Sequence, residues 1–172
     1  MAHKFTLNPE CLKRRFAVYV VIAKGDGDTK IYVGKTGDNR DGCNPVISRC
    51  GNHFSYNKMH SQVRNKIPDH ERRVYTYVFD HFDEYSEDVE QRREGVDRIN
   101  EMERWLNEEI QIAITSANDV ELVNPMSGSH AAKSRRTTRS SFRTEQARKK
   151  IAEIVEEVKR ELGLTDRDLF TR

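Results

Sequence analysis

The feature that most constrains the fold is an apolar run, a turn and a second apolar run near the N-terminus. Phe16–Ala23 reads FAVYVVIA, which has the length and valine content of a buried β-strand. Gly25–Asp28 (GDGD) is a strong turn signal, and Ile31–Val33 resumes the strand character. Two strands that flank a Gly/Asp turn predict a β-hairpin, so the fold is expected to be built on a sheet.

Further elements follow from periodicity and from helix start and stop signals. Asn44-Pro45 offers a capping side chain followed by proline at the first helical position, and Gly163 is a helix stop. Helices are predicted over Pro45–His53, Lys58–Lys66, Glu87–Ile114 and Thr144–Leu162, and strands over Arg73–Phe79 and, as a short strand or an extended segment, Val120–Val123. The expected class is α+β: a small three-stranded, mainly antiparallel sheet flanked by helices.

The chain of 172 residues fits one domain with an appendage. Residues 1–126 carry the predicted sheet, residues 127–143 read as a basic linker rich in Ser, Gly, Thr and Arg, and residues 144–172 form a C-terminal helical appendage. Packing of the last helix on its own domain is the favoured use of its apolar stripe, and a homodimer interface is the alternative. That stripe consists of Ala147, Ile151, Ile154, Val158 and Leu162.

The net charge of +2 hides two opposite blocks. Asp83–Glu109 contains eleven acidic and four basic residues, whereas Lys133–Lys150 contains eight basic residues and one acidic residue. The second block suits a polyanionic partner, because each lysine or arginine near a phosphate releases counterions. A solvated charged surface without a partner is the other interpretation.

Composition bears on the expected cellular location of the protein. No run of about 18 apolar residues exists, which argues against a membrane span, and the N-terminus does not resemble a secretory signal. The three cysteines are an odd count, so a reducing, cytoplasmic location is expected. Cys43, Cys50 and His53 raise the question of zinc, but without a CxxC pair free thiols are favoured.

One glutamate breaks the apolar pattern of the long helix. Glu103 lies four residues after Ile99 and three before Leu106, which places all three on one helical face toward the sheet. A carboxylate there is costly unless it is paired or binds a cation, so a metal ligand and a partner of an arginine such as Arg49 both remain open. Glu101 lies nearly opposite and is expected to be solvated.

Tyr19 and Tyr32-Val33-Gly34-Lys35-Thr36 on the predicted hairpin resemble the paired motif of the GIY-YIG nucleases. Ala17 replaces the first glycine of that motif, whereas both tyrosines and the second glycine are kept. Downstream, Arg49 and His53 form R-x3-H, Glu103 lies where the family has its metal-binding glutamate, and Asn124 is similar to the asparagine that closes the domain. The resemblance covers about residues 16–126.

The resemblance implies phosphodiester hydrolysis in DNA with Mg²⁺ or Mn²⁺ held by Glu103. It assigns Arg49 to the phosphate charge and Tyr32, aided by His53, to the attacking water. A neighbouring Lys35, Arg49 and metal are expected to favour the phenolate of Tyr32. Tyr19 is assigned to the phosphate or its attacking water.

Other expected substrate contacts lie outside this catalytic set. Lys35 is assigned to a phosphate, and Asn124 to orienting the glutamate or bracing the site. Arg135, Arg136 and Arg139 of the basic segment are expected to track the DNA backbone. The overall expectation is a restriction-type or phage-type endonuclease. The alternatives are a catalytically inactive nucleic-acid-binding module on the same fold and an interaction protein that binds through its acidic helix.

Overall fold

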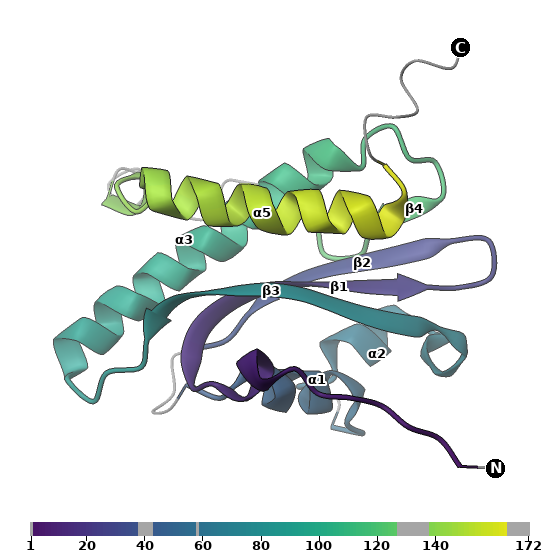
Figure 1. Ribbon diagram of the computed structural model, residues 1–172, viewed down its shortest axis with the longest axis horizontal. Coiled ribbons are helices and arrows are strands. Elements are labelled where there is room, and N and C mark those ends of the chain that lie inside the picture. Colours follow the sequence, from purple (N-terminus) through teal and green to yellow (C-terminus); the bar gives the residue numbers. More distant parts are fainter. Residues whose placement is uncertain (1, 38–42, 58, 127–137, 165–172) are drawn as a thin grey trace.

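A four-stranded sheet in the order β3-β1-β2-β4 runs through the computed structural model, which describes residues 2–37, 43–57, 59–126 and 138–164 (Figure 1). β1 (Arg15–Lys24) and β2 (Thr29–Lys35) form the predicted antiparallel hairpin. The Gly25 amide donates to the Asp28 carbonyl at 2.9 Å, and Gly27 has a φ of +87°, which favours glycine. The hairpin prediction is confirmed.

The α+β class is also confirmed, but the sheet is mixed and has one strand more than predicted. β3 (Val74–Glu84) pairs antiparallel with β1 and is longer than expected. β4 (Val120–Leu122) pairs parallel with Thr29–Ile31 of β2, so the segment left open as strand or extended chain is a strand. Its three residues carry little strand signal, and the neighbouring β2 supplies the hydrogen-bonding edge that they need.

Helices cover both faces of the sheet (Figure 1). α3 (Val89–Ala113) and α5 (Glu145–Leu162) lie on one face, and α1 (Val46–Phe54), α2 (Gln62–Lys66) and the 3-10 helix η1 (Pro9–Leu12) lie on the other. A second 3-10 helix, η2 (His70–Arg72), precedes β3. α2 is shorter than predicted, because Ser61 uses its side chain on the carbonyls of Ser55 and Asn57 instead of continuing the helix.

Strand alternation divides the buried side chains between the two faces. Val18, Val20 and Ile22 of β1 belong to the large apolar cluster under α3 and α5, whereas Tyr19 and Val21 belong to the smaller cluster under α1 and α2. The two hairpin tyrosines therefore point away from the main core. Within the described residues, no helix is both long and apolar enough to cross a membrane.

The C-terminal helix is part of the main core. Thr144 caps its N-terminus by accepting from the Ala147 amide, and Gly163 ends it with a left-handed φ of 73°. Its apolar stripe is buried against α3 and the sheet, as the favoured interpretation expected, and so this stripe is not free to form a dimer interface. The buried members are Ala147, Ile151, Ile154, Val155 and Val158.

The basic segment and the acidic block, where the structure describes them, neutralise each other. Arg143, just before α5, donates to Glu101 at 2.8 Å and to Glu108 at 2.9 Å. Arg104 also donates to Glu101 at 2.6 Å, and Glu101 is 0% exposed. The prediction that Glu101 is solvated was wrong, because the approach of the α5 segment covers a second face of α3.

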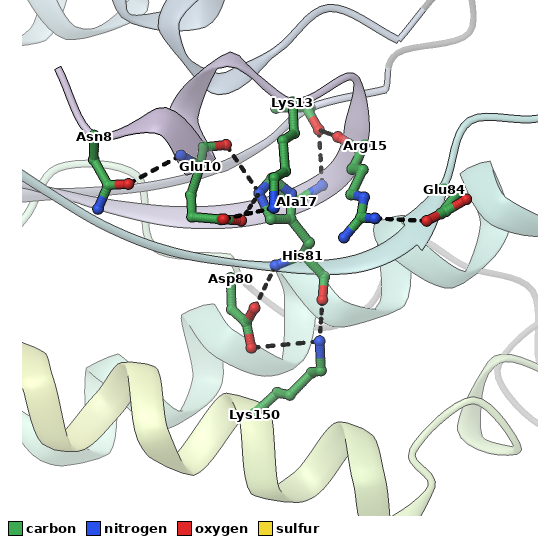
Figure 2. A network of polar contacts seen from close by, with 10 residues as sticks. Asn8, Glu10, Lys13, Arg15, Ala17, Asp80, His81, Glu84 and Lys150 are labelled. Carbon is green, nitrogen blue, oxygen red and sulfur yellow. Dashed lines mark hydrogen bonds and ion pairs between the residues drawn. The ribbon is translucent and has the colours of Figure 1, made fainter.

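Polar contacts also connect the helices on both faces to the edge strand β3 (Figure 2). Lys150 of α5 donates to the carbonyl of His81 and lies 3.5 Å from the carboxylate of Asp80. On the other side of the strand, His81 Nε2 lies 3.1 Å from the Glu10 carbonyl of η1. These contacts tie both helical layers to the edge of the sheet, and they engage a lysine that had been grouped with a possible DNA-binding segment.

Candidate active site

The two hairpin tyrosines reach the site because a glycine opposite one of them leaves room for its ring. Tyr19 on β1 is paired in register with Gly34 on β2. A Cβ atom at position 34 would lie 2.5 Å from the Tyr19 hydroxyl oxygen, closer than atoms can approach. Gly34 therefore lets the Tyr19 ring lie across the neighbouring strand, which gives a physical reason for the glycine in the second half of the motif.

α1 supplies the next two side chains from adjacent turns. Arg49 and His53 are four residues apart, so both face the sheet. His53 is 1% exposed, and its Nε2 lies 3.0 Å from the Tyr19 hydroxyl. Arg49 also hydrogen-bonds Tyr19, although burial dominates and raises the pKa of this phenol well above its usual range. Tyr19 is therefore a protonated, fully buried phenol with two hydrogen-bonding neighbours.

Tyr32 is the more accessible of the two phenols. Its ring meets His53 edge-on with a centroid separation of 5.3 Å, and 9% of the residue is exposed. Burial, and next the charge of Glu103, raise the pKa of Tyr32 to about 12, although Arg49 opposes the shift. As expected, the charge of Arg49 favours the phenolate of Tyr32, but desolvation outweighs this effect, so the protein side chains alone leave the phenol protonated. The structure also places the His53 hydrogen bond on Tyr19 rather than on Tyr32.

Glu103 is the candidate that α3 contributes. Its carboxylate lies 3.9 Å from Lys35 Nζ, and 17% of each side chain is exposed. Burial raises the pKa of Glu103, and the charges of Lys35 and Arg49 oppose the rise. The same carboxylate acts on the pKa of both tyrosines, so the acid, the two phenols and the guanidinium share one electrostatic environment. Direct contacts join Tyr19 to His53 and Arg49, and Glu103 to Lys35, whereas Glu103 reaches the tyrosines and Arg49 only through its charge.

The donor set fits a hard divalent cation held by a single protein carboxylate. Within the described residues, no group of three or more His, Cys, Asp or Glu side chains is arranged to hold a metal ion. Mg²⁺ usually keeps several waters and takes only one or two carboxylates, so Glu103 alone satisfies that chemistry. The Glu103 side chain is only 17% exposed, and Lys35 at 3.9 Å together with Arg49 already offsets part of the cost of its burial, which a divalent cation would offset further. Mn²⁺ accepts the same oxygen ligands.

The remaining sequence candidates separate into two groups. Lys35 lies 3.9 Å from Glu103, whereas the side-chain amide of Asn124 hydrogen-bonds the backbone of β2. The Asn124 side chain accepts from the Val33 amide at 3.0 Å and donates to the Val33 carbonyl at 2.7 Å, continuing the pairing begun by β4. This arrangement matches a brace for the strand that carries Tyr32.

The expected DNA-tracking arginines are not gathered at the site where the structure describes them. Arg139 lies 3.8 Å from Asp97 of α3, on the helical layer opposite α1. Arg135 and Arg136 lie outside the described residues.

One site residue was missed by sequence analysis. Tyr77 on β3 lies with its hydroxyl 3.1 Å from His53 Nδ1, the ring nitrogen that faces away from Tyr19. In sequence it is one of two alternating tyrosines in a strand and looks like ordinary core. The pairing of Val21 with Tyr77 brings it beside His53, and this register is not readable from the sequence.

His53 should make the stability of the protein depend on pH. Burial, and next the charge of Arg49, lower the pKa of His53 to about 4 from its usual value of 6.5. Below about pH 6.5 the unfolded chain binds a proton that the folded protein accepts only near pH 4, so the free energy of unfolding falls through this window. A shift of this size corresponds to a loss of about 3 kcal/mol.

Urea unfolding at a series of pH values tests this expectation against His53→Gln, which cannot titrate. The wild type should lose stability more steeply than the variant between pH 6.5 and 4. The other titrating groups, including His81, contribute to both curves and cancel in the difference. Parallel curves would show that His53 protonates equally in the folded and unfolded chain.

The chain matches no protein-family model, no curated protein and no solved structure among known proteins.

Proposed function

We propose that the protein is a metal-dependent endonuclease of the GIY-YIG type that hydrolyses phosphodiester bonds in DNA. The observation that carries the proposal is the convergence of Tyr19, Tyr32, Arg49, His53 and Glu103 from three separate parts of the chain. They come from a hairpin, a short helix and a long helix, yet they share one electrostatic environment. A desolvated carboxylate, two buried phenols and a guanidinium that influence one another's pKa values form the kind of group that is common at functional sites.

Phosphodiester cleavage needs an oriented water, a proton acceptor and positive charge at the phosphate. Tyr32, the less buried of the two phenols, would hold the attacking water. Arg49 and Lys35 provide the two positive charges that would stabilise the extra negative charge of the transition state. A divalent ion bound at Glu103 would supply Lewis-acid stabilisation of the leaving oxygen.

Tyr19 and His53 are the most deeply buried pair of the site. Tyr19 hydrogen-bonds Arg49 and so fixes the guanidinium relative to the sheet. His53 is neutral at pH 7, because its pKa is lowered to about 4, so its imidazole can accept a hydrogen bond from Tyr19. A neutral His53 leaves Arg49 and Lys35 as the positive charges available to the phosphate.

A plasmid-nicking assay on the full chain tests the proposal directly. Supercoiled plasmid should be converted to the open-circular or linear form in Mg²⁺ or Mn²⁺ and should stay supercoiled in EDTA. Binding of the plasmid without cleavage in either metal would instead identify a nucleic-acid-binding module that kept the fold and lost the activity. Absence of both binding and cleavage would remove the nucleic-acid assignment altogether.

A further inference from the structure

Three aromatic side chains and one thiol form a connected series of polar contacts, in the order Tyr19, His53, Tyr77 and Cys50. The Tyr19 hydroxyl lies 3.0 Å from His53 Nε2, and His53 Nδ1 lies 3.1 Å from the Tyr77 hydroxyl. The rings of His53 and Tyr77 are nearly parallel, at 20°. Tyr77 in turn hydrogen-bonds the thiol of Cys50 on α1. Neither Tyr77 nor Cys50 belongs to the catalytic set described above.

The direction of these hydrogen bonds follows from what each group can donate. A neutral imidazole carries one proton, so one ring nitrogen donates and the other accepts. Tyr19 is 0% exposed, and its hydroxyl proton therefore needs an acceptor inside the protein. Among the described residues, its hydroxyl hydrogen-bonds Arg49 and His53, and a guanidinium has only donors. The acceptor is therefore His53 Nε2.

The remaining assignments follow in order. Because Nε2 is unprotonated, the proton of His53 lies on Nδ1 and is donated to the Tyr77 oxygen. The Tyr77 hydroxyl proton is then directed to the Cys50 sulfur, which is a weak acceptor. Burial raises the pKa of Tyr77 well above its usual value, so the hydroxyl keeps its proton at neutral pH.

We propose that Tyr77, supported by Cys50, is a positioning residue that holds His53 in the tautomer with a free Nε2 facing Tyr19. This inference deepens the proposed nuclease function and rests on it for its catalytic part. With the opposite tautomer, Tyr19 would face two donors, and its own proton would point toward the Arg49 guanidinium. The hydroxyl proton of Tyr19 would then oppose the hydrogen bond from Arg49, and His53 could not accept a hydrogen bond from Tyr19.

The tautomer can be measured without any activity. Long-range ¹H–¹⁵N spectra of the full chain, labelled at histidine and recorded near pH 7, distinguish a protonated from an unprotonated ring nitrogen. The wild type should show an unprotonated Nε2 at His53. Tyr77→Phe removes the acceptor for Nδ1, so the signals should shift toward a mixture or toward protonated Nε2. A wild-type spectrum with Nε2 protonated overturns the proposal.

Two matched variants separate positioning from general damage. Tyr75→Phe removes a hydroxyl from the same strand that donates to the His70 carbonyl at 2.9 Å, away from His53, and it should leave the tautomer unchanged. Cys50→Ser keeps an acceptor for Tyr77 and should also keep the wild-type tautomer, whereas Cys50→Ala should weaken the preference. An equal response to Tyr75→Phe and Tyr77→Phe would contradict a specific role for Tyr77.

The catalytic part is tested by nicking rates. Tyr77→Phe should lower kcat about tenfold, the effect expected when one buried hydrogen bond is lost from the transition state, with KM within about twofold of the wild type. A changed tautomer with an unchanged kcat would refute the positioning role. A wild type that does not nick DNA would overturn the nuclease proposal alone, because the nitrogen signals would still decide the direction of the hydrogen bonds.

Discussion

Replacing Glu103 by alanine is expected to reduce the rate of Mg²⁺-dependent nicking by at least about a thousandfold, because a metal ion contributes several kcal/mol at the transition state and each factor of ten is worth about 1.4 kcal/mol. Glu103→Gln should do the same while keeping the size of the side chain. DNA binding in EDTA should change little in either variant, since Arg49 and Lys35 remain.

Stability provides an independent readout for the same substitution. The pKa of Glu103 is raised in the folded protein, so its ionised form is disfavoured and lowers stability at neutral pH. Glu103→Gln should therefore be at least as stable as the wild type in urea at pH 7. Loss of activity without loss of stability is the combination expected of a metal ligand.

The control for Glu103 must be an acid on the same helix that lies in solvent. Glu90 in the first turn of α3 is exposed, and Glu90→Ala should leave both the nicking rate and the stability near the wild-type values. Full Mg²⁺-dependent activity in Glu103→Ala would exclude the assigned role. A drop of similar size in Glu90→Ala would show that the assay responds to any loss of acidic charge from α3.

Glu101→Ala is expected to destabilise the fold by about 3 kcal/mol, because removal of a buried carboxylate leaves its partners without compensation. Glu101 is 0% exposed and binds both Arg104 and Arg143, whose side chains are 31% and 25% exposed. Both arginines keep a second acceptor in Glu108, which limits the loss. The free energy of unfolding in urea is the measurement.

A surface ion pair on the same helix is the matched control. Glu94 lies 2.6 Å from Arg98 in an exposed i,i+4 pair, and Glu94→Ala should cost about 0.5 kcal/mol or less. If Glu101→Ala is equally mild, the buried network does not hold α5 to α3. The pair of results would also test whether the two opposite charge blocks of this chain serve its own fold.

Local patterns in the sequence determined the hairpin and the approximate positions of the helices, whereas the five candidate catalytic residues were selected by the resemblance to the GIY-YIG nucleases. Local rules were sufficient for the hairpin and helices: a Gly/Asp turn between two apolar runs has one favoured outcome, and residues four apart on a helix share a face. Arg49 and His53 therefore had to point the same way, and Glu103 had to accompany Ile99 and Leu106.

Tertiary structure decided which helical faces are covered and which strands are neighbours. The helical wheel of α3 allowed for one buried face, toward the sheet, and so placed Glu101 in solvent. α5 and the arginine before it cover a second face, and this contact joins residues 42 positions apart, Glu101 and Arg143. The pairing of β3 with β1 likewise placed Tyr77 on His53. The residue pattern of one helix or strand predicts which of its side chains share a face. Which faces are buried, and which hydrogen bonds form, depends on segments far away in the chain, and a local pattern does not show where those segments pack.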